Sequence, residues 1–420
     1  MLQRSTLLPG IRLTAVKSDK FKTATLCLCL VRPLRADEAA MNALLPSVLL
    51  RGSRAYPTMR ELSRFLETAY GASCGAIVRK RGEAQLTGLY AEFLDDALLP
   101  EPLLPDMISL LGGQLLDPMT AEGGFLPEYF AVERDNLRNA MEAEANDKRV
   151  YAFRRLCRRM FRGESFATPA AGEKAELDAV TPQSLYAHYR RILTQSPIEI
   201  IYQGSSDPGP IAAAFRDLLS PFAGAERPLP PPPAAAVQRE AQAFSETQPL
   251  EQSKLVVGFR MAIPQTPVEL AAQQVFLAVY GAGPSSRLFL RMREEHSLCY
   301  SVSASFDRCK GALFVYAGID ADQYDSALRE IRAQLAACAA GRISDEELQF
   351  AKSQLRSQLR AIGDNPARLE ELYLGDAVGP IRATVAERTA AVEAVTADDV
   401  AAAAGTVRED TVFFLKGAAE

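Results

Sequence analysis

Histidine is scarce in this sequence: the 420 residues include only two, His188 and His296, which lie in opposite halves of the chain. A helical zinc site usually takes two histidines four residues apart on one helix face, so these two cannot form such a pair. His188 follows Pro182, which is predicted to open a helix, and we expect it at the surface or half-buried.

Long apolar runs are also absent. No stretch reaches the roughly 18 apolar residues that a membrane-spanning helix needs. The first residues are interrupted by Pro9 and Gly10 before the apolar core of a signal peptide could form.

The seven cysteines are odd in number and irregularly spaced, which favours free thiols in a reducing compartment. Cys27 and Cys29 alternate along one predicted strand, which favours core packing over a zinc site. We therefore expect a soluble cytoplasmic protein without a membrane partner.

A surplus of basic residues is missing as well. Lysine and arginine number 47 against 52 aspartates and glutamates, which gives a formal net charge of −5 and no reason to expect a nucleic-acid partner. The one basic run, Lys148 to Arg162, favours a solvated helix face, with an acidic partner surface as the alternative. Gly281-Ala282-Gly283 lacks the third glycine of a dinucleotide-binding fingerprint, and the sequence contains no phosphate-binding Walker loop. No serine lies in the nucleophile motif of serine hydrolases.

The length predicts two domains. A chain of 420 residues with 48% apolar residues is long enough for two cores of about 200 residues each. Four consecutive prolines within Glu226 to Val237 favour an extended spacer without strand hydrogen bonds. We therefore expect a first domain over residues 1–225, a linker over 226–237 and a second domain over 238–420.

The order of the predicted elements repeats in the two halves. Residues 70–92 and 296–318 share a strand–turn–strand layout, and each is preceded and followed by a helix. We expect a helix over 39–50 that Pro46 interrupts, and a long helix over 127–161 that bends near residues 146–147. The sequence thus predicts an α+β fold of two homologous two-layer domains, each a mainly antiparallel sheet covered by helices.

The most informative stretch is GAGPSSRLFLRMREEHSLCYSV, residues 281–302. A glycine turn precedes a helix predicted from Ser285 to about Glu295, and a strand is expected from Leu298. Arg293 and Tyr300 therefore emerge at one helix–strand junction, where a guanidinium and a phenol can both offer hydrogen-bond donors.

This stretch resembles the second-half signature of the insulinase/pitrilysin family of zinc metallopeptidases. The shared elements are the glycine-rich turn, S-S-R-L-F at 285–289, R-E at 293–294 and L-x-Y-S-V at 298–302. The resemblance implies the family's architecture of two domains that face each other across a cavity. It also gives Arg293 and Tyr300 the role of the family's substrate-holding residues.

The zinc site of that family is missing. Active members carry H-x-x-E-H in the first half, before a turn that here is Arg51-Gly52-Ser53. Counting back places Ala43 and Ser47 at the two histidine positions and Pro46 at the glutamate position, and none of them can bind zinc or polarise water. Glu133 matches the third zinc ligand, but one carboxylate is far short of three ligands, so we expect an ordinary surface or ion-paired glutamate and no metal.

The resemblance therefore implies a non-catalytic subunit, similar to the small bacterial members that occur as two-subunit peptidases. Such a chain would pair with a zinc-bearing homologue, or associate with itself, and would grip a peptide or protein substrate through Arg293 and Tyr300. Zinc is expected only in the partner subunit. Two alternatives remain: a zinc-independent peptidase with an unrecognised site, and a peptide-binding or scaffold protein without a role in proteolysis.

Overall fold

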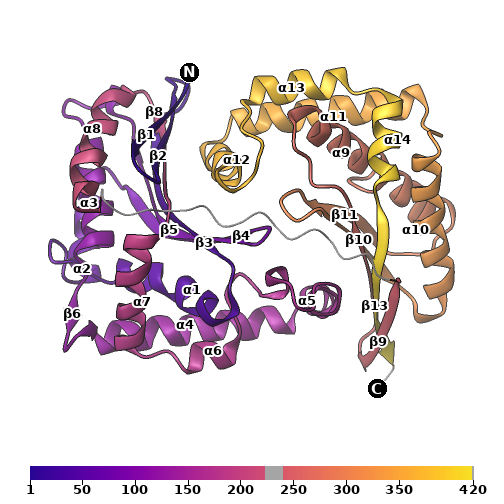
Figure 1. The fold of residues 1–420 in the computed structure, drawn as a ribbon, viewed down its shortest axis with the longest axis horizontal. Coiled ribbons are helices and arrows are strands. Elements are labelled where there is room, and N and C mark those ends of the chain that lie inside the picture. The colour runs from indigo at the N-terminus through magenta and orange to yellow at the C-terminus, as the bar shows by residue number, and fades with distance from the viewer. Residues whose placement is uncertain (223–239, 419–420) are drawn as a thin grey trace. The chain divides into compact units, whose positions relative to one another are not determined.

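The computed structural model describes residues 1–222 and 240–418 (Figure 1). These residues form two compact units: unit 1 comprises 1–142, 168–222 and 365–378, and unit 2 comprises 143–167, 240–364 and 379–418. The predicted linker, 226–237, lies outside the described residues, so the predicted domain boundary stays a prediction. Among the described residues, no helix combines the length and the apolar character needed to cross a membrane.

Unit 1 is built from a six-stranded sheet, a small hairpin and helices. Its strands are β1 (Leu2–Leu8), β2 (Ile11–Lys17), β3 (Thr23–Pro33), β4 (Ser73–Arg81), β5 (Ala84–Leu94), β6 (Thr120–Ala121), β7 (Gly124–Phe125) and β8 (Ile198–Gly204). Its helices are α1 (Ala36–Leu50), α2 (Met59–Thr68), η1 (Asp96–Leu98), α3 (Leu104–Leu116), most of α4 (Pro127–Asn146), α6 (Lys174–Asp178), α7 (Pro182–Gln195), α8 (Pro208–Leu219), η3 (Ser220–Phe222) and α12 (Pro366–Val378).

Unit 2 is built from a five-stranded sheet and helices. Its strands are β9 (Gln242–Pro249), β10 (Ser253–Arg260), β11 (Ser301–Asp307), β12 (Ala312–Ile319) and β13 (Arg408–Ala418). Its helices are α5 (Lys148–Met160), η2 (Ser165–Ala167), α9 (Pro267–Tyr280), the π-helix η4 (Phe289–Glu295), η5 (Ala321–Gln323), α10 (Tyr324–Ala339), α11 (Asp345–Gly363), α13 (Val385–Ala394) and α14 (Ala397–Gly405).

The two sheets have the same topology. The strand order is β2-β8-β3-β5-β4 in unit 1, with β1 added at the β2 edge, and β9-β13-β10-β12-β11 in unit 2. In each sheet the first pair is parallel and the following pairs are antiparallel. Leu28 on the central strand β3 is paired with Leu89 on β5 and Ile200 on β8. In the same way, Val257 on β10 is paired with Val315 on β12 and Val412 on β13. The prediction of two homologous α+β domains is confirmed.

Each central strand is buried on both faces because helices cover both sides of its sheet. In β3, Leu26, Leu28 and Leu30 pack into the core that α1, α3 and α7 complete. Side chains alternate along a strand, so Cys27 and Cys29 point to the opposite face, where their sulfurs lie 3.4 Å apart. Both thiols are free and buried, as core packing requires, and the hydrogen bond with Cys29 together with burial raises the pKa of Cys27.

One helix of each unit comes from the other half of the chain. The predicted long helix is in fact two helices, α4 and α5, and the break lies where the bend was expected, at Asp147, whose side chain caps α5. Helix α5 then packs Ala152, Leu156 and Met160 against the sheet of unit 2, while α12 packs against β3 and β8 of unit 1. The predicted domain 1–225 therefore contributes a helix to unit 2, and 238–420 contributes one to unit 1.

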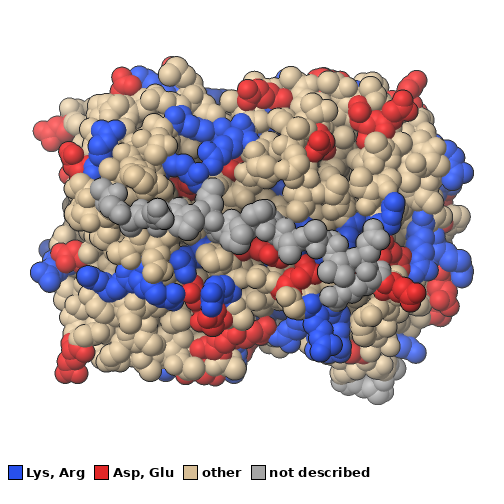
Figure 2. Space-filling model, in the orientation of Figure 1, with Lys and Arg blue, Asp and Glu red and all other residues tan. Residues whose placement is uncertain are grey.

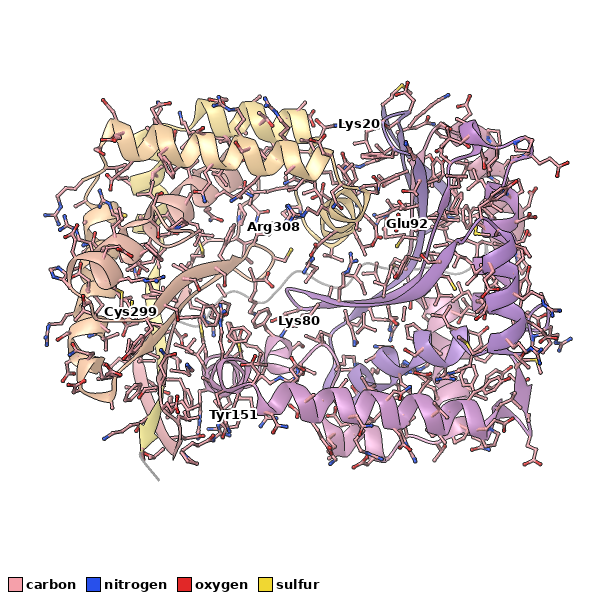
Figure 3. All side chains as sticks on the ribbon, turned by 180° about the vertical axis from the view of Figure 1, so that it is seen from behind. Lys20, Lys80, Glu92, Tyr151, Cys299 and Arg308 are labelled. Atoms are coloured by element: carbon pink, nitrogen blue, oxygen red, sulfur yellow. The ribbon has the colours of Figure 1, made fainter. Side chains whose placement is uncertain are left out.

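The two exchanged helices carry opposite charges that match their sheets. On α5, Arg155 pairs with Glu246 of β9, and Tyr151, labelled in Figure 3, donates to the same carboxylate at 2.8 Å. On α12, the carboxylate of Glu370 lies 3.1 Å from Arg79. The expectation that the basic run forms a solvated face is thus wrong for Arg155, which binds within its own unit. Acidic and basic side chains are interspersed over the face drawn in Figure 2.

Candidate functional site

The three residues at the zinc-motif positions lie on α1, which runs without a break from Ala36 to Leu50. Ala43 and Pro46 are buried and Ser47 is half-buried. Ala43 and Ser47 are four residues apart and share a helix face, as two histidine ligands would. A methyl group and a hydroxymethyl group in these places offer no ligand set for zinc.

The prediction that Pro46 interrupts this helix is wrong, and the structure gives the reason. A proline inside a helix has no N–H, so the carbonyl of the residue four positions earlier, here Asn42, loses its helical donor. The hydroxyl of Thr87 on β5 donates to that carbonyl at 2.6 Å, and Thr87 is buried. Because a neighbouring strand supplies the missing hydrogen bond, α1 continues through the proline.

Glu133 on α4, at the position of the third zinc ligand, is paired with a guanidinium. Arg51, directly after α1, forms an ion pair with the carboxylate of Glu133, and Asn136 donates to its other oxygen at 3.3 Å. An arginine cation thus occupies the carboxylate that a zinc ion would need. Within residues 1–222 and 240–418, no three His, Cys, Asp or Glu side chains converge on a point where they could hold a metal ion. The residues present do not fit a catalytic zinc.

His188 is buried on α7, so the expectation of a surface or half-buried position is wrong. Arg191 can only donate, and its contact of 2.8 Å makes Nδ1 of His188 an acceptor. Nε2 therefore carries the proton and donates to Oδ1 of the Asn42 side-chain amide at 2.7 Å. Burial lowers the pKa of His188 to about 4, against the attraction of Glu38. The histidine is a neutral link in a structural network and offers no lone pair to a metal.

The signature stretch of unit 2 is held in place by its first arginine. Arg287 forms a two-point ion pair with Glu347 of α11, with N–O distances of 2.6 and 2.8 Å. These hydrogen bonds lower the pKa of Glu347 to about 2. Leu288 and Met292 are fully buried beneath the segment. Arg287 is therefore a structural residue that fixes where the following turn begins.

The predicted helix over 285–295 is a π-helix from Phe289 to Glu295. At its end the His296 N–H donates to the Arg291 carbonyl, five residues back, at 3.0 Å. Ser297 then adopts a positive φ of 50°, a sparsely populated backbone state for a residue other than glycine. π-Helices and positive-φ residues are uncommon and occur often at functional sites. Arg293 lies within the π-helix, and Ser297 lies between Arg293 and Tyr300.

Arg293 and Tyr300 are both exposed. The side chain of Arg293 is 48% exposed, lies over the Phe289 ring at 5.0 Å and approaches Glu294 no closer than 3.7 Å. Tyr300 is 59% exposed and is anchored by its N–H, which donates to the Gly318 carbonyl at 2.9 Å just before β11. Cys299, labelled in Figure 3, marks this point of the chain. Among the described residues no hydrogen bond joins Arg293 to Tyr300, so each can contact a ligand independently.

Asp320 is the residue that sequence reasoning missed. The hydroxyl of Tyr300 lies 3.2 and 3.3 Å from the two carboxylate oxygens of Asp320, which follows β12. The negative charge of Asp320 and this hydrogen bond raise the pKa of Tyr300. The single proton of the phenol is thus directed at Asp320 and only the oxygen lone pairs face outward. The sequence carries no signal for this contact beyond the strand pairing that brings 300 and 318–320 together.

Comparisons with known proteins agree with these observations. A family described as "Peptidase M16 inactive domain" matches residues 179–355, which include Arg293 and Tyr300. A Bacillus subtilis protein described as "Probable inactive metalloprotease YmfF" is 29% identical over 418 residues, covering 97% of this chain and 96% of that protein.

Two solved structures share the fold. A conserved protein from Enterococcus faecalis has a TM-score of 0.90 at 28% identity, covering 100% of this chain and 99% of that one. A peptidase M16 inactive domain from Pseudomonas fluorescens has a TM-score of 0.78 at 14% identity, covering 99% and 98%. The Bacillus subtilis protein and the Pseudomonas fluorescens domain are both described as inactive.

Proposed function

Because this chain belongs to the peptidase M16 family, also called the insulinase/pitrilysin family, and lacks the family's zinc motif, we propose that it is a non-catalytic subunit of a peptidase. In this proposal it pairs with a zinc-bearing homologue and supplies Arg293 and Tyr300 to hold the peptide. The observation that carries the proposal is the contrast between two regions. The zinc-motif positions carry no ligands, while Arg293 and Tyr300, at the positions of the family's substrate-holding residues, are present and exposed.

The contacts of Arg293 suit a role in peptide binding. Its guanidinium has five N–H donors, and the 3.7 Å approach to Glu294 leaves donors available for the carbonyl groups of an extended peptide. Stacking over Phe289 restricts the side chain without using those donors. An arginine that is oriented before binding loses less entropy when a peptide arrives.

Tyr300 has a more specific requirement. Its hydroxyl can donate to the scissile carbonyl only after its proton turns away from Asp320. In the proposed complex, Asp320 is a positioning residue that holds the Tyr300 phenol in place until substrate binds. The developing negative charge on the carbonyl then competes with the carboxylate for the proton, which favours donation in the transition state.

Two other functions compete with this one. A zinc-independent peptidase would cleave peptides without any partner, and a scaffold or peptide-binding protein would tolerate loss of both side chains. A second copy of this chain is the alternative partner. We place the complex in the cytoplasm, because none of the seven cysteines forms a disulfide, which suits a reducing compartment.

The test is kinetic and uses the complex with a zinc-bearing homologue from the same source. Tyr300→Phe should lower peptide turnover by about 10²–10³, the usual effect of losing one donor to a developing negative charge. Arg293→Ala should lower kcat/KM, because this side chain binds the carbonyl groups of the peptide. Complex formation, followed by analytical ultracentrifugation, should stay at the wild-type level because both side chains are exposed.

Matched controls come from the same chain. Arg291→Ala removes an exposed arginine two positions earlier, which pairs with Glu295, and Tyr70→Phe removes the hydroxyl of an exposed tyrosine in unit 1. Both should keep wild-type turnover. Wild-type turnover by the Arg293 and Tyr300 variants in an intact complex would leave the scaffold function as the better description.

A further inference from the structure

A cavity of about 530 Å³ opens between α3 and α8 of unit 1, and it shares no lining residue with the sites described above. Its floor is aliphatic and consists of Leu104 and Ile108 from α3 and Ile211, Ala214 and Leu218 from α8. The volume lies within the range of about 300–1,000 Å³ that is typical of small-molecule sites. Among the described residues, no aromatic side chain lines it, so these residues offer no surface for stacking a planar ring.

The walls of this cavity are rigid. At Gly112 the two helices touch so closely that a β-carbon there would lie 2.6 Å from a methyl group of Leu218. Three prolines, Pro102, Pro105 and Pro210, line the cavity, and their fixed φ angles restrict the backbone around it. The cavity is therefore preformed, which reduces the entropy lost when a ligand binds.

Of the described residues that line the cavity, only Asp96 and Asp207 are charged. Asp96 accepts the N–H groups of Leu103 and Leu104 at 2.8 and 3.1 Å with one oxygen, and the hydroxyl of Ser206 at 3.1 Å with the other. These three donors fix the carboxylate in place. Asp207 is exposed and lies 3.8 Å from the ammonium group of Lys17, too far for a hydrogen bond.

The backbone around the cavity is unsuited to an anion. Helix α8 begins Pro208-Gly209-Pro210, and prolines have no N–H to donate, so this helix end offers few donors. The N-terminus of α3 is already capped by Asp96. We infer that the cavity binds an aliphatic ammonium ion, with its alkyl chain on the floor and its charged head at Asp96. This inference does not depend on the proposed function.

Isothermal titration calorimetry with decylammonium and decanoate tests the inference, because the two probes share a chain length and differ in charge. Decylammonium should bind at least about tenfold more tightly than decanoate, the usual effect of one charge-assisted hydrogen bond. Ala214→Trp fills the cavity and should abolish binding. Ala213→Trp places the same side chain on the exposed side of the same helix and should leave binding unchanged.

Charge variants identify the head-group site. Asp96→Asn keeps an oxygen for the α3 amides but removes the charge, so affinity for decylammonium should fall about tenfold. The same change at Asp217, exposed on α8 outside the cavity, should have no effect. Circular dichroism verifies that each variant is folded. Equal binding of decanoate, absence of decylammonium binding, or an equal loss in Ala213→Trp would overturn the inference.

Discussion

Replacing Glu164 should destabilise unit 2 by removing the charge that anchors the exchanged helix α5. Glu164 follows α5 and accepts two hydrogen bonds from Arg260 at 2.6 and 3.0 Å, while Lys310 lies 2.6 Å away. The Arg260 and Lys310 side chains are only 11% and 1% exposed. Breaking a buried ion pair by removing one partner costs about 3–5 kcal/mol. Glu164→Gln still offers an acceptor oxygen, so we expect about 3 kcal/mol.

Urea unfolding followed by far-ultraviolet circular dichroism measures this loss, since the protein has no tryptophan to report by fluorescence. The control is Glu144→Gln. It removes the exposed ion-pair partner of Arg154, which lies on α5, and should cost less than about 0.5 kcal/mol.

Burial disfavours ionisation of Glu164, but the hydrogen bonds from Arg260 and Lys310 outweigh it and lower its pKa. Its contribution should therefore be present at neutral pH and disappear as the pH falls below the unfolded-state value of about 4.3. A wild-type unfolding free energy in Glu164→Gln would refute this reasoning.

Two further predictions concern unit 1. Thr87→Val should cost about 1–3 kcal/mol of unfolding free energy, because the Asn42 carbonyl loses its donor. In a Pro46→Ala background the restored helical N–H should remove most of that cost; equal costs in both backgrounds would contradict the explanation. His188 should titrate by NMR near pH 4, so stability should fall by up to about 3 kcal/mol as the pH drops from about 6.5 towards 4. A measured His188 pKa near 6.5 would contradict the network described for it.

The repeated fold could be predicted because its signals are local. The strand–turn–strand segments 70–92 and 296–318 correspond to β4–β5 and β11–β12, which occupy the same places in the two sheets. The same holds for Thr58 and Ser344, which each lie three residues before a glutamate, a local pattern that predicts a helix start, and which cap α2 and α11 in the structure. Patterns that repeat within a few residues do not depend on how distant segments meet.

The exchange of helices could not be predicted in this way. The sequence indicates that α5 has an apolar face, but the period of that face does not identify the sheet that it covers. Its arginines suggested solvent or a partner because the matching carboxylate, Glu246, lies more than eighty positions later. Burial of His188 has the same origin, since its partner Asn42 comes from a distant part of the chain.

The candidate site was predictable in part. The motif placed Arg293 and Tyr300 near each other in the sequence, and both are exposed in unit 2. The apolar pattern of Leu288, Phe289 and Met292 fits an α-helix and a π-helix equally, so the observed form depended on tertiary packing. The contact with Asp320 depended on the pairing of β11 with β12 and therefore required the structure.

The loss of the zinc site at three positions of α1 is tested most directly by measuring bound zinc per chain after equilibrium dialysis. The wild-type chain should hold well under one zinc ion, because Ala43, Pro46 and Ser47 offer no ligand set and Glu133 is paired with Arg51. The combined variant Ala43→His, Pro46→Glu and Ser47→His, made in an Arg51→Ala background that frees Glu133, restores the ligand set and should hold about one zinc ion. Either of two results would contradict this explanation. One is a wild-type chain that binds one zinc ion and loses it in Glu133→Ala. The other is a folded combined variant that binds no zinc.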